Sequence, residues 1–506
     1  MSFKYIITVL IWCLAVVGTH AGQVKTTLSD LGATKIYLSK PFHYKLGFSV
    51  SGIGDFNADG LRDIAIGAPA YNPGGLEDDH DNGAVFLIFG DQLKNESNRV
   101  DLASKSFTSA VVMGQYGEKV GNCIAQVGDI NVDGFDDVAF GSSEGRAGYV
   151  LFGQPNPRRL LHLADLQSDG LRVAHTGYTV ESAGDFNGDF FPDVVFGNPE
   201  SEKVAAKEKE YAIGNVSILF GQKEYPAEID IIQPGETHVS KRGPAGARLG
   251  YSIAGGFNMN ADGFSDLFFT LPGGGSDFQG RGVLVHGSNE VDEQWEYSFI
   301  VNHVNRFARH PGDLNGDGFP DLVLGKENSS FILWGGNYLE GTIDLAKTLD
   351  PRWGVTVKGA ESAYGVGDLD GNGYDDLAIA LPHQKVNGNP LAGCVVFLLG
   401  REEWPETIDV DQILLGNFTA MDYVLVYGEE AFGAFGYSVA GVGDIQGDGF
   451  DDVVIGAPYE ALPGDTTSQK AGMAFVIQGK SIFYTQQSQR SLFHPSLSLT
   501  RKNARG

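Results

Sequence analysis

The chain has 506 residues, of which 42% are hydrophobic, 20% are charged and 70 are glycine. So many glycines, with few charged residues and no long tract rich in Glu, Lys and Leu, exclude a helical bundle and favour an all-β protein with many turns. The formal net charge of −28 excludes nucleic acid as a partner and argues against attraction to anionic lipid.

The first residues are typical of a secretory signal peptide. Residues 1–21 contain a lysine near the start, an apolar run from Ile6 to Val17, and small residues up to Ala21. This run is too short for a membrane span, so we expect a secreted or extracellular protein with no membrane span. Beyond it, Cys123 and Cys394 are expected to be buried, unpaired thiols. The candidate acceptors for N-linked glycans are Asn95, Asn215, Asn328 and Asn417.

Residues 22–480 are predicted to form one domain built of repeats, and residues 481–506 a disordered tail. The pattern DxNxDGxxD recurs seven times, some copies being imperfect, in units of about 55 residues with loop insertions. In the last copy, Phe435-Gly-Tyr-Ser-Val precedes the pattern and Val453-Val-Ile-Gly-Ala-Pro458 follows it. Short apolar runs separated by Gly, Pro, Asn and Asp indicate strands joined by tight turns, and four strands per unit indicate a propeller blade.

Seven units predict a seven-bladed β-propeller of four-stranded antiparallel blades, because a closed ring leaves no exposed sheet edge. The N-terminal segments Leu28–Leu31 and Lys35–Ser39 are typical of an outermost strand, whereas the chain after Gly479 lacks one. We therefore expect the N-terminal segment to complete the blade that begins at Phe435 and to close the ring.

Each copy of the repeated loop offers oxygen ligands for a hard cation. Side chains at positions 1, 3, 5 and 9 and the backbone carbonyl at position 7 can converge, while Gly at position 6 permits the sharp turn. The all-oxygen set favours Ca²⁺ over zinc or copper, and an apolar residue at position 12 followed by a strand excludes an EF-hand. In chain order, the predicted ligands are Asp55, Asn57, Asp59 and Asp63; Asp129, Asn131, Asp133 and Asp137; Asp185, Asn187, Asp189 and Asp193; Asn258, Asn260, Asp262 and Asp266; Asp313, Asn315, Asp317 and Asp321; Asp368, Asp370, Asn372 and Asp376; and Asp444, Gln446, Asp448 and Asp452.

The seven loops differ in how well they match this pattern. A single loop of this kind can be a metal-free turn, but seven copies in register and the strong acidity favour up to seven calcium ions. Phe190 occupies the glycine position of the third loop, where a positive φ costs about 1 kcal/mol or more. The fourth loop begins with Asn258, and the seventh has Gln446 at position 3. We expect the first, second, fifth and sixth loops to bind best and the third to bind worst or stay empty.

The motifs around the loops carry a family resemblance. With Leu46-Gly-Phe-Ser-Val50 before the first loop, Ile66-Gly-Ala-Pro69 after it, and the match from Phe435 to Pro458, the chain resembles FG-GAP repeat proteins, above all the integrin α-subunit propeller. The resemblance covers residues 25–480. It implies that the calcium loops lie on one face, and that the turns after Ala-Pro and before Phe-Gly form the opposite face, where integrin heads meet their partners.

The resemblance favours a binding module for cell adhesion, with an extracellular protein or glycan ligand and, by the same likeness, an integrin-like partner subunit. The alternative is that the acidic residues on the face opposite the calcium loops do not bind a partner and lie in loops that are simply solvated. The residues that could contact a partner there are Tyr71, Glu77, Asp78, Asp79, His80 and Asp81 in one loop and Tyr459, Glu460 and Asp465 in another.

Two other functions compete with adhesion. A calcium-stabilised carbohydrate-binding lectin would need exposed aromatic residues, although tryptophans more often pack in a core. The candidates are Trp295, Trp334, Trp353 and Trp404. An accessory propeller of a phospholipase-D-like hydrolase is the third function. The chain has no HExxH motif, and His303 and His310 are the histidines nearest to a pair, so we expect no enzyme activity and no catalytic residue.

Overall fold

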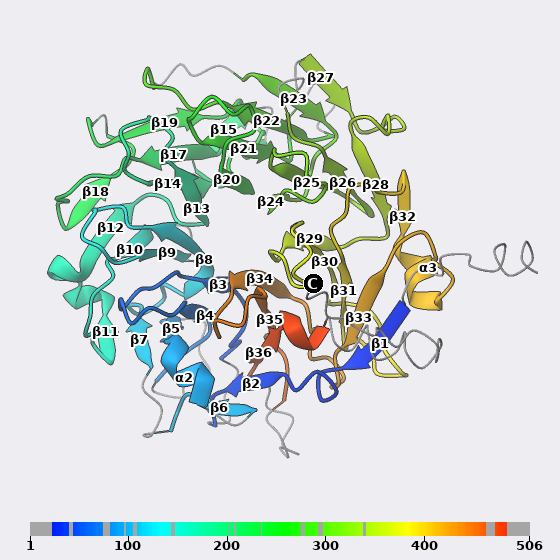
Figure 1. The fold of residues 1–506 in the computed structure, drawn as a ribbon. Helices are drawn as coiled ribbons and strands as arrows, with labels where there is room; N and C mark the ends of the chain where they lie inside the picture. Colours follow the sequence, from blue (N-terminus) through cyan, green and yellow to red (C-terminus); the bar gives the residue numbers. More distant parts are fainter. Residues whose placement is uncertain are drawn as a thin grey trace, which may run out of the picture.

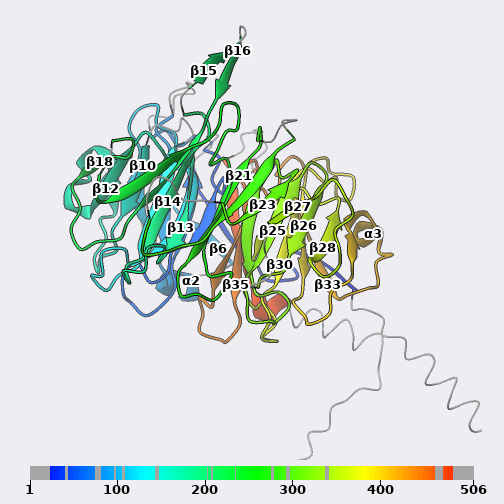
Figure 2. The same cartoon turned by 90° about the horizontal axis from the view of Figure 1, so that it is seen from above.

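The computed structural model describes residues 23–39, 44–73, 81–95, 98–104, 109–142, 147–201, 203–206, 209–233, 235–274, 279–291, 297–336, 341–461 and 471–482. Seven sheets stand around a central axis like the blades of a propeller (Figure 1). Seen from the side, a separate hairpin of β15 (Lys203–Ala206) and β16 (Lys209–Ala212) projects from the ring (Figure 2). The predicted signal peptide and nearly all of the predicted tail lie outside the described residues.

Each blade contains four antiparallel strands that run in order from the axis to the rim, which confirms the predicted seven-bladed, all-β fold. Apolar, β-branched runs between turns are what such half-buried strands require. From the first blade to the seventh, the strands are β3 (Val50–Gly52), β4 (Ile64–Ala68), β5 (Ala84–Ile88) and β7 (Ala110–Met113); β8 (Val120–Gly128), β9 (Asp137–Ser142), β10 (Ala147–Leu151) and β12 (Gly170–Ala174); β13 (Thr179–Gly184), β14 (Asp193–Asn198), β17 (Asn215–Leu219) and β19 (His238–Arg242); β20 (Ile253–Phe257), β21 (Asp266–Leu271), β22 (Arg281–Val285) and β23 (Phe299–Asn302); β24 (Ala308–Gly312), β25 (Asp321–Lys326), β26 (Ser329–Leu333) and β28 (Gly354–Lys358); β29 (Ser362–Gly365), β30 (Leu377–Leu381), β31 (Cys394–Leu398) and β33 (Tyr423–Tyr427); and β34 (Ser438–Gly443), β35 (Asp452–Ala457), β36 (Met473–Gln478) and β2 (Thr34–Tyr37).

Six blades carry a fifth strand at the rim that the repeat pattern did not predict. It runs parallel to the fourth strand and is donated by the next blade, from the segment that precedes that blade's own fourth strand. In the order of the blades that receive them, these strands are β11 (Leu160–His162), β18 (Glu228–Asp230), β27 (Gly341–Asp344), β32 (Thr407–Asp409), β1 (Gln23–Thr27) and β6 (Arg99–Asp101). Neighbouring blades are therefore joined by backbone hydrogen bonds at the rim as well as by their packing.

The N-terminal segment closes the ring, as predicted, and it does so in two blades. β2 pairs antiparallel with β36, Thr34 opposite Val476, and so completes the seventh blade. β1 pairs in parallel with β33 of the sixth blade. Lys35 Nζ lies 2.8 Å from Glu429 Oε2. Burial acts to raise the pKa of Glu429, but the hydrogen bond and charge of Lys35 and the hydrogen bonds of Ser29 together lower it.

The small residues of the repeat motif have a packing reason at two of the blade boundaries. Ser49 Oγ donates a hydrogen bond of 2.8 Å to the carbonyl of Gly121 in the second blade, and a Cβ on Gly67 would lie 2.2 Å from the same oxygen. At the closure of the ring, Ser438 Oγ donates to the Gly47 carbonyl at 2.9 Å. The serine after Phe-Gly and the glycine before Ala-Pro thus let one blade contact the backbone of the next.

The hydrophobic core lies between adjacent blades, where residues of neighbouring sheets form shared clusters. The few helices lie in connections: α2 (Gly90–Asn95), α3 (Val410–Leu415) and the 3₁₀ turns η1 (Leu163–Asp165) and η2 (Gln167–Asp169). No helix in the described part of the chain has the length and apolarity needed to cross a membrane. Cys123 and Cys394 are both free, as predicted, but only Cys394 is fully buried.

Candidate cation-binding loops and partner face

The seven acidic loops lie at the same end of their blades. Each joins the first strand of a blade to the second, whereas the Ala-Pro turns join the second strand to the third. Because the strands are antiparallel, these two sets of turns lie on opposite faces of the ring. The two-faced arrangement that the resemblance implied is therefore present.

In the first loop, the side chains at positions 1, 3 and 5 gather around one stretch of backbone. The N–H of Asp59 donates to Asp55 Oδ1 and to Asn57 Oδ1, at 3.0 Å each, and the N–H of Gly60 donates to Asp55 Oδ2 at 2.9 Å. Asn57 Nδ2 donates to Asp59 Oδ2 at 3.0 Å. The second and third loops repeat this set. One turn thus assembles the oxygen donors that Ca²⁺ prefers.

The aspartate at position 9 is buried in every loop and fastens the loop to its blade. Asp63 accepts hydrogen bonds from the N–H of Phe56 at 3.0 Å and from the N–H of Gly90, which follows the third strand, at 2.9 Å. The other six loops have the same two bonds. Burial raises the pKa of Asp63 to about 7, although both hydrogen bonds act to lower it.

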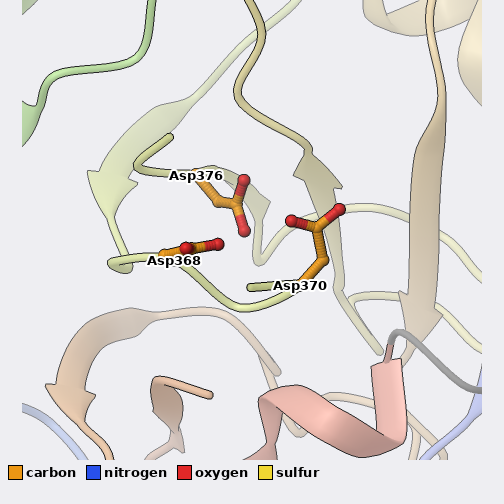
Figure 3. Close-up of side chains that lie close together, drawn as sticks. All are labelled: Asp368, Asp370 and Asp376. Atoms are coloured by element: carbon orange, nitrogen blue, oxygen red, sulfur yellow. The ribbon is translucent and has the colours of Figure 1, made fainter. Parts of the chain in front are cut away.

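The sixth loop brings three carboxylates together. Oxygens of Asp368, Asp370 and Asp376 lie within 4.8 Å of one another (Figure 3). Here Asp stands at position 3 and Asn at position 5, and Asn372 Nδ2 donates to the Gly400 carbonyl at 3.2 Å. Burial, and next the charge of Asp368, raise the pKa of Asp370 to about 6. Among the described residues, this is the arrangement of carboxylates best suited to hold a cation.

Backbone strain does not single out the third loop as predicted. Phe190 has the expected positive φ, 70°, and its ring is 90% exposed. Position 4 of every loop also has a positive φ, and this position is Ala58 in the first loop, Val132 in the second and Ala261 in the fourth. Positions 4 and 6 have a positive φ in every loop. In each of the first four loops one of these two positions is not glycine, whereas in the last three loops both are glycine. Sequence reasoning missed position 4 because only its φ reveals the constraint.

The fourth loop differs most from the others in charge. At position 1, Asn258 Oδ1 accepts from the N–H of Asp262 at 3.3 Å, longer than the matching bond in the first loop. His286 Nδ1 lies 3.0 Å from Oδ1 of Asp266, the position-9 residue. This hydrogen bond raises the pKa of His286, which favours a positive charge beside Asp266 in this loop. These features make the fourth loop a weaker candidate than the third.

Three loops are tied to their neighbours by an aspartate at position 8 that was not among the predicted site residues. Asp136 Oδ2 accepts the N–H of Asp55 at 2.8 Å, Asp375 Oδ2 that of Asp313 at 2.8 Å, and Asp451 Oδ2 that of Asp368 at 3.0 Å. In each case the accepting carboxylate belongs to one loop and the donating position-1 residue to the preceding loop around the face. The paired acids at positions 8 and 9 were the available sequence signal.

Among the described residues, the predicted partner face contains fewer exposed acidic side chains than expected. Tyr71 packs on Tyr44 and Phe86, with ring centroids 4.9 and 5.6 Å apart, so it supports the core. Glu460 is 5% exposed, which makes the prediction of a solvated loop wrong for this residue. Tyr459 is partly exposed and meets Tyr437 edge-on. Asp81 is described and partly exposed, whereas Glu77, Asp78, Asp79, His80 and Asp465 lie outside the described residues.

Three apolar side chains that sequence reasoning missed are exposed on this face. Tyr116 is 68% exposed, Phe432 50% and Leu391 39%. Tyr116 and Phe432 lie in turns between blades, and Leu391 lies in a turn between second and third strands. The last two are neighbours, because the N–H of Phe432 donates to the Pro390 carbonyl at 2.8 Å. Exposed aromatic side chains are common anchors of protein interfaces.

The tryptophans predicted as sugar-binding candidates divide into two groups. Trp334 and Trp404 lie 6.0 Å apart in a T-shaped pair and line a groove of about 350 Å³, together with Asn315 of the fifth loop. Trp353 packs on a core cluster, and Trp295 lies outside the described residues.

His303 and His310, the histidines nearest to a pair in the sequence, have separate neighbours. His303 Nδ1 lies 2.6 Å from Asp344 Oδ1, while His310 is half-buried, with its ring centroid 5.1 Å from that of Phe257.

Glycans are expected at Asn328 and Asn417 but not at Asn215. The first two side chains are exposed, whereas Asn215 is 4% exposed within β17 and a glycan there would force the strand out of its blade. The side chain of Asn95 lies outside the described residues. Glycopeptide mass spectrometry of protein made in a eukaryotic secretory host measures the occupancy, and a glycan on Asn215 would contradict this expectation.

The fold is a seven-bladed propeller in which an acidic loop joins the first strand of each blade to the second. The comparisons with known proteins agree with this fold. A family model described as FG-GAP repeat matches residues 46–88 and 435–477, which lie in the first and seventh blades. The chain therefore carries FG-GAP repeats in a seven-bladed β-propeller, and it resembles the propeller of integrin α subunits.

The relatives fall into two kinds. Over 475 residues the chain is 26% identical to the phosphatidylinositol-glycan-specific phospholipase D of Bos taurus, covering 89% of this chain and 47% of that protein. It is 28% identical to integrin alpha-PS3 of Drosophila melanogaster over 33% of this chain and 15% of that protein. With integrin alpha-V of Gallus gallus the identity is 24%, over 39% of this chain and 19% of that protein. The chain thus spans about half or less of the length of these relatives.

Proposed function

We propose that this protein is a secreted, calcium-stabilised binding module of the adhesion type. One observation carries the proposal: seven loops of the same geometry lie on one face of an integrin-α-like propeller, each with oxygen ligands at positions 1, 3, 5 and 9. Similar loops at equivalent places connect strands and have no associated nucleophile, so the cations would stabilise the fold instead of taking part in chemistry.

Calcium is the cation that suits these donors best. Carboxylate and amide oxygens from a short turn with a buried aspartate at its end form an all-oxygen site, as in the sixth loop. We rank the fifth, sixth and seventh loops as the strongest sites, since their turns carry glycine at both positions of positive φ. The fourth loop ranks last because of Asn258 and His286.

The partner would bind on the face opposite the loops, through the exposed side chains Tyr116, Leu391 and Phe432 together with Tyr459. A protein or glycan outside the cell is the expected ligand, and the similarity to integrin α subunits supports an additional partner subunit. A pull-down with the folded, calcium-loaded protein, run beside a glycan array, tests the proposal. A stable protein partner supports adhesion, and glycan hits alone favour a lectin. If the protein binds neither a protein nor a glycan, both functions are contradicted.

Replacing exposed side chains on the partner face should weaken binding without unfolding the protein. We expect Tyr116→Ala and Phe432→Ala to reduce affinity about tenfold or more each, as interface anchors do, with unchanged melting temperature. Tyr71→Ala is the matched contrast: it removes a ring that packs on Tyr44 and Phe86, so it should lower the melting temperature. Binding by surface plasmon resonance and melting by calorimetry measure the two effects. Full affinity in both exposed-side-chain variants would rule out this face.

A lectin remains the second candidate because of the groove at Trp334 and Trp404. Aromatic rings beside an amide and the exposed carboxylates of Glu402, Glu403 and Glu406 can stack on a sugar and bond its hydroxyls. However, Trp404 Nε1 donates to the Leu314 carbonyl at 3.0 Å, so this ring also holds two blades together.

We also propose that the protein is not an enzyme. The match to the phospholipase D covers less than half of that protein, and nearly all of this chain's share of the match lies in the propeller. Release of a glycosylphosphatidylinositol-anchored reporter protein from cells by the purified chain would overturn this proposal.

A further inference from the structure

The central channel of the ring contains a polar cavity of about 680 Å³ that neither the loops nor the partner face accounts for. The innermost strands of all seven blades line it. A cavity of this size can enclose a small molecule, and it is walled by strands instead of mobile turns.

Seven residues of the innermost strands occupy one level of this channel. Each pairs with the residue two places after the buried position-9 aspartate of its own blade; Glu181, for example, is opposite Val195. The seven residues are Ser51, Ala125, Glu181, Ala254, Arg309, Tyr364 and Ala440. Four of them are serine or alanine, so the space at this level is bounded by three large side chains, one acidic, one basic and one aromatic.

The acid and the base at this level form no ion pair with each other; burial raises the pKa of Glu181 to about 7, and the charge of Arg309 acts to lower it. Glu181 accepts a hydrogen bond of 3.2 Å from the N–H of Ser182 and forms no ion pair with any described residue. Arg309 lies over the ring of Tyr364, 5.4 Å from its centroid, and Nη1 donates to Ser252 Oγ and to the Ala308 carbonyl, at 2.9 Å each. Its Nε and Nη2 have no hydrogen-bond partner among the described residues. The guanidinium is therefore held in place, and its Nε and Nη2 groups can still donate hydrogen bonds to a ligand.

An acid and a base that share a partly buried channel without forming an ion pair are costly unless something satisfies both. A lone anion would bond Arg309 but be repelled by Glu181, and a lone cation would face the reverse problem. We propose that the channel binds a small zwitterion such as a free α-amino acid, with its ammonium group at Glu181 and its carboxylate at Arg309. A guanidinium fork suits a carboxylate, and the neighbouring Tyr364 ring offers an apolar surface for the rest of the ligand.

The other titratable groups on the cavity wall are already engaged. Burial lowers the pKa of His310 to about 4, so it is neutral and leaves Arg309 as the cation at this level. Glu361 is bonded to His383, whose Nδ1 lies 2.5 Å from Oε2. Arg306 Nη1 donates to the Glu327 carbonyl at 2.8 Å. Glu181 and Arg309 are thus the two charges available to a ligand.

Isothermal titration calorimetry of the full, calcium-loaded protein tests the proposal, with glycine, L-alanine and L-leucine as probes and acetate and methylammonium as single-charge controls. We expect at least one amino acid to bind, and acetate and methylammonium to bind at least about tenfold more weakly, because each makes only half of the charge-assisted bonds. Glu181→Gln and Arg309→Met should each weaken amino-acid binding at least about tenfold. Glu361→Gln, at the edge of the same cavity, should leave it unchanged.

The proposal fails if none of the three amino acids binds the unmodified protein, if acetate or methylammonium binds as tightly as the best of them, or if Glu181→Gln retains full affinity. Should Arg309→Met not fold, the comparison of acetate with the amino acids on the unmodified protein still decides the role of the second charge.

Discussion

Chelation of calcium is expected to lower the melting temperature of this protein by about 10 °C or more. If each good loop binds with a dissociation constant of about 0.1 mM and free calcium is about 1 mM, each contributes about 1.4 kcal/mol to the free energy of unfolding. Four to seven such sites together give about 6 to 10 kcal/mol, which is comparable with the whole stability of an ordinary domain. Removing the ions also leaves the grouped carboxylates of each loop to repel one another. Differential scanning calorimetry with calcium and with chelator measures the shift.

Variants of single loops provide the control for this prediction. Asp317→Ala in the fifth loop should remove most of one site's calcium-dependent gain, whereas Asp262→Ala in the fourth should remove little, because Asn258 and His286 already weaken that loop. By the same logic, Asp317→Ala should cost more than Asp189→Ala in the third loop, where Phe190 has a positive φ. Identical melting curves for the unmodified protein with and without chelator would exclude a stabilising role for calcium.

Asp321→Ala is expected to destabilise the protein by about 2–6 kcal/mol even when no calcium is present. Asp321 is fully buried, and its two oxygens accept the N–H groups of Leu314 at 2.9 Å and Gly335 at 3.0 Å. Alanine leaves both of these buried donors unpaired, and each unpaired donor costs about 1–3 kcal/mol. Chemical denaturation of the chelated protein, followed by tryptophan fluorescence, measures the change in the free energy of unfolding.

The matched control is Asp317→Ala in the same loop. Asp317 is exposed and its carboxylate accepts bonds only within the turn, from Phe319 and Asn315. Its replacement should therefore matter when calcium is present and have little effect in chelator. If both variants behave alike in chelator, the buried aspartate has no structural role separate from metal binding.

The sequence predicts the number of blades and the place of the loops because both follow from a repeated local pattern. Seven copies of one motif between apolar runs admit few arrangements other than a closed ring, and the missing last strand at one end matches the spare strand at the other. Even so, the rim strands were missed. Segments such as Leu160–His162 are three residues long, and they become strands only because a neighbouring blade offers an edge.

The candidate site was predictable residue by residue only where its members are close in sequence. Positions 1 to 9 of a loop are local, so their ligands could be read directly. His286 lies 20 residues beyond Asp266, and Asp136 lies 81 residues beyond Asp55, so nothing local connects them. The meeting of Glu181 and Arg309 at one level of the channel depends on strand register in two separate blades, which a repeat pattern with variable insertions leaves undetermined.

The closure of the ring by β1 and β2 also sets the order in which the protein can fold. Ribosomes release the N-terminal residues first, yet β2 lacks its antiparallel partner until β36, around Val476, has been made, although β6 can pair with its other edge earlier. During synthesis, two strands with open edges must therefore wait while more than 400 residues emerge, and such edges are sites of aggregation. Pairing across so great a sequence separation is slow. Early blades can form as they appear, but the ring can close only after β33 and β36 have been made, so shielding of β1 and β2 until then should raise the yield of folded protein.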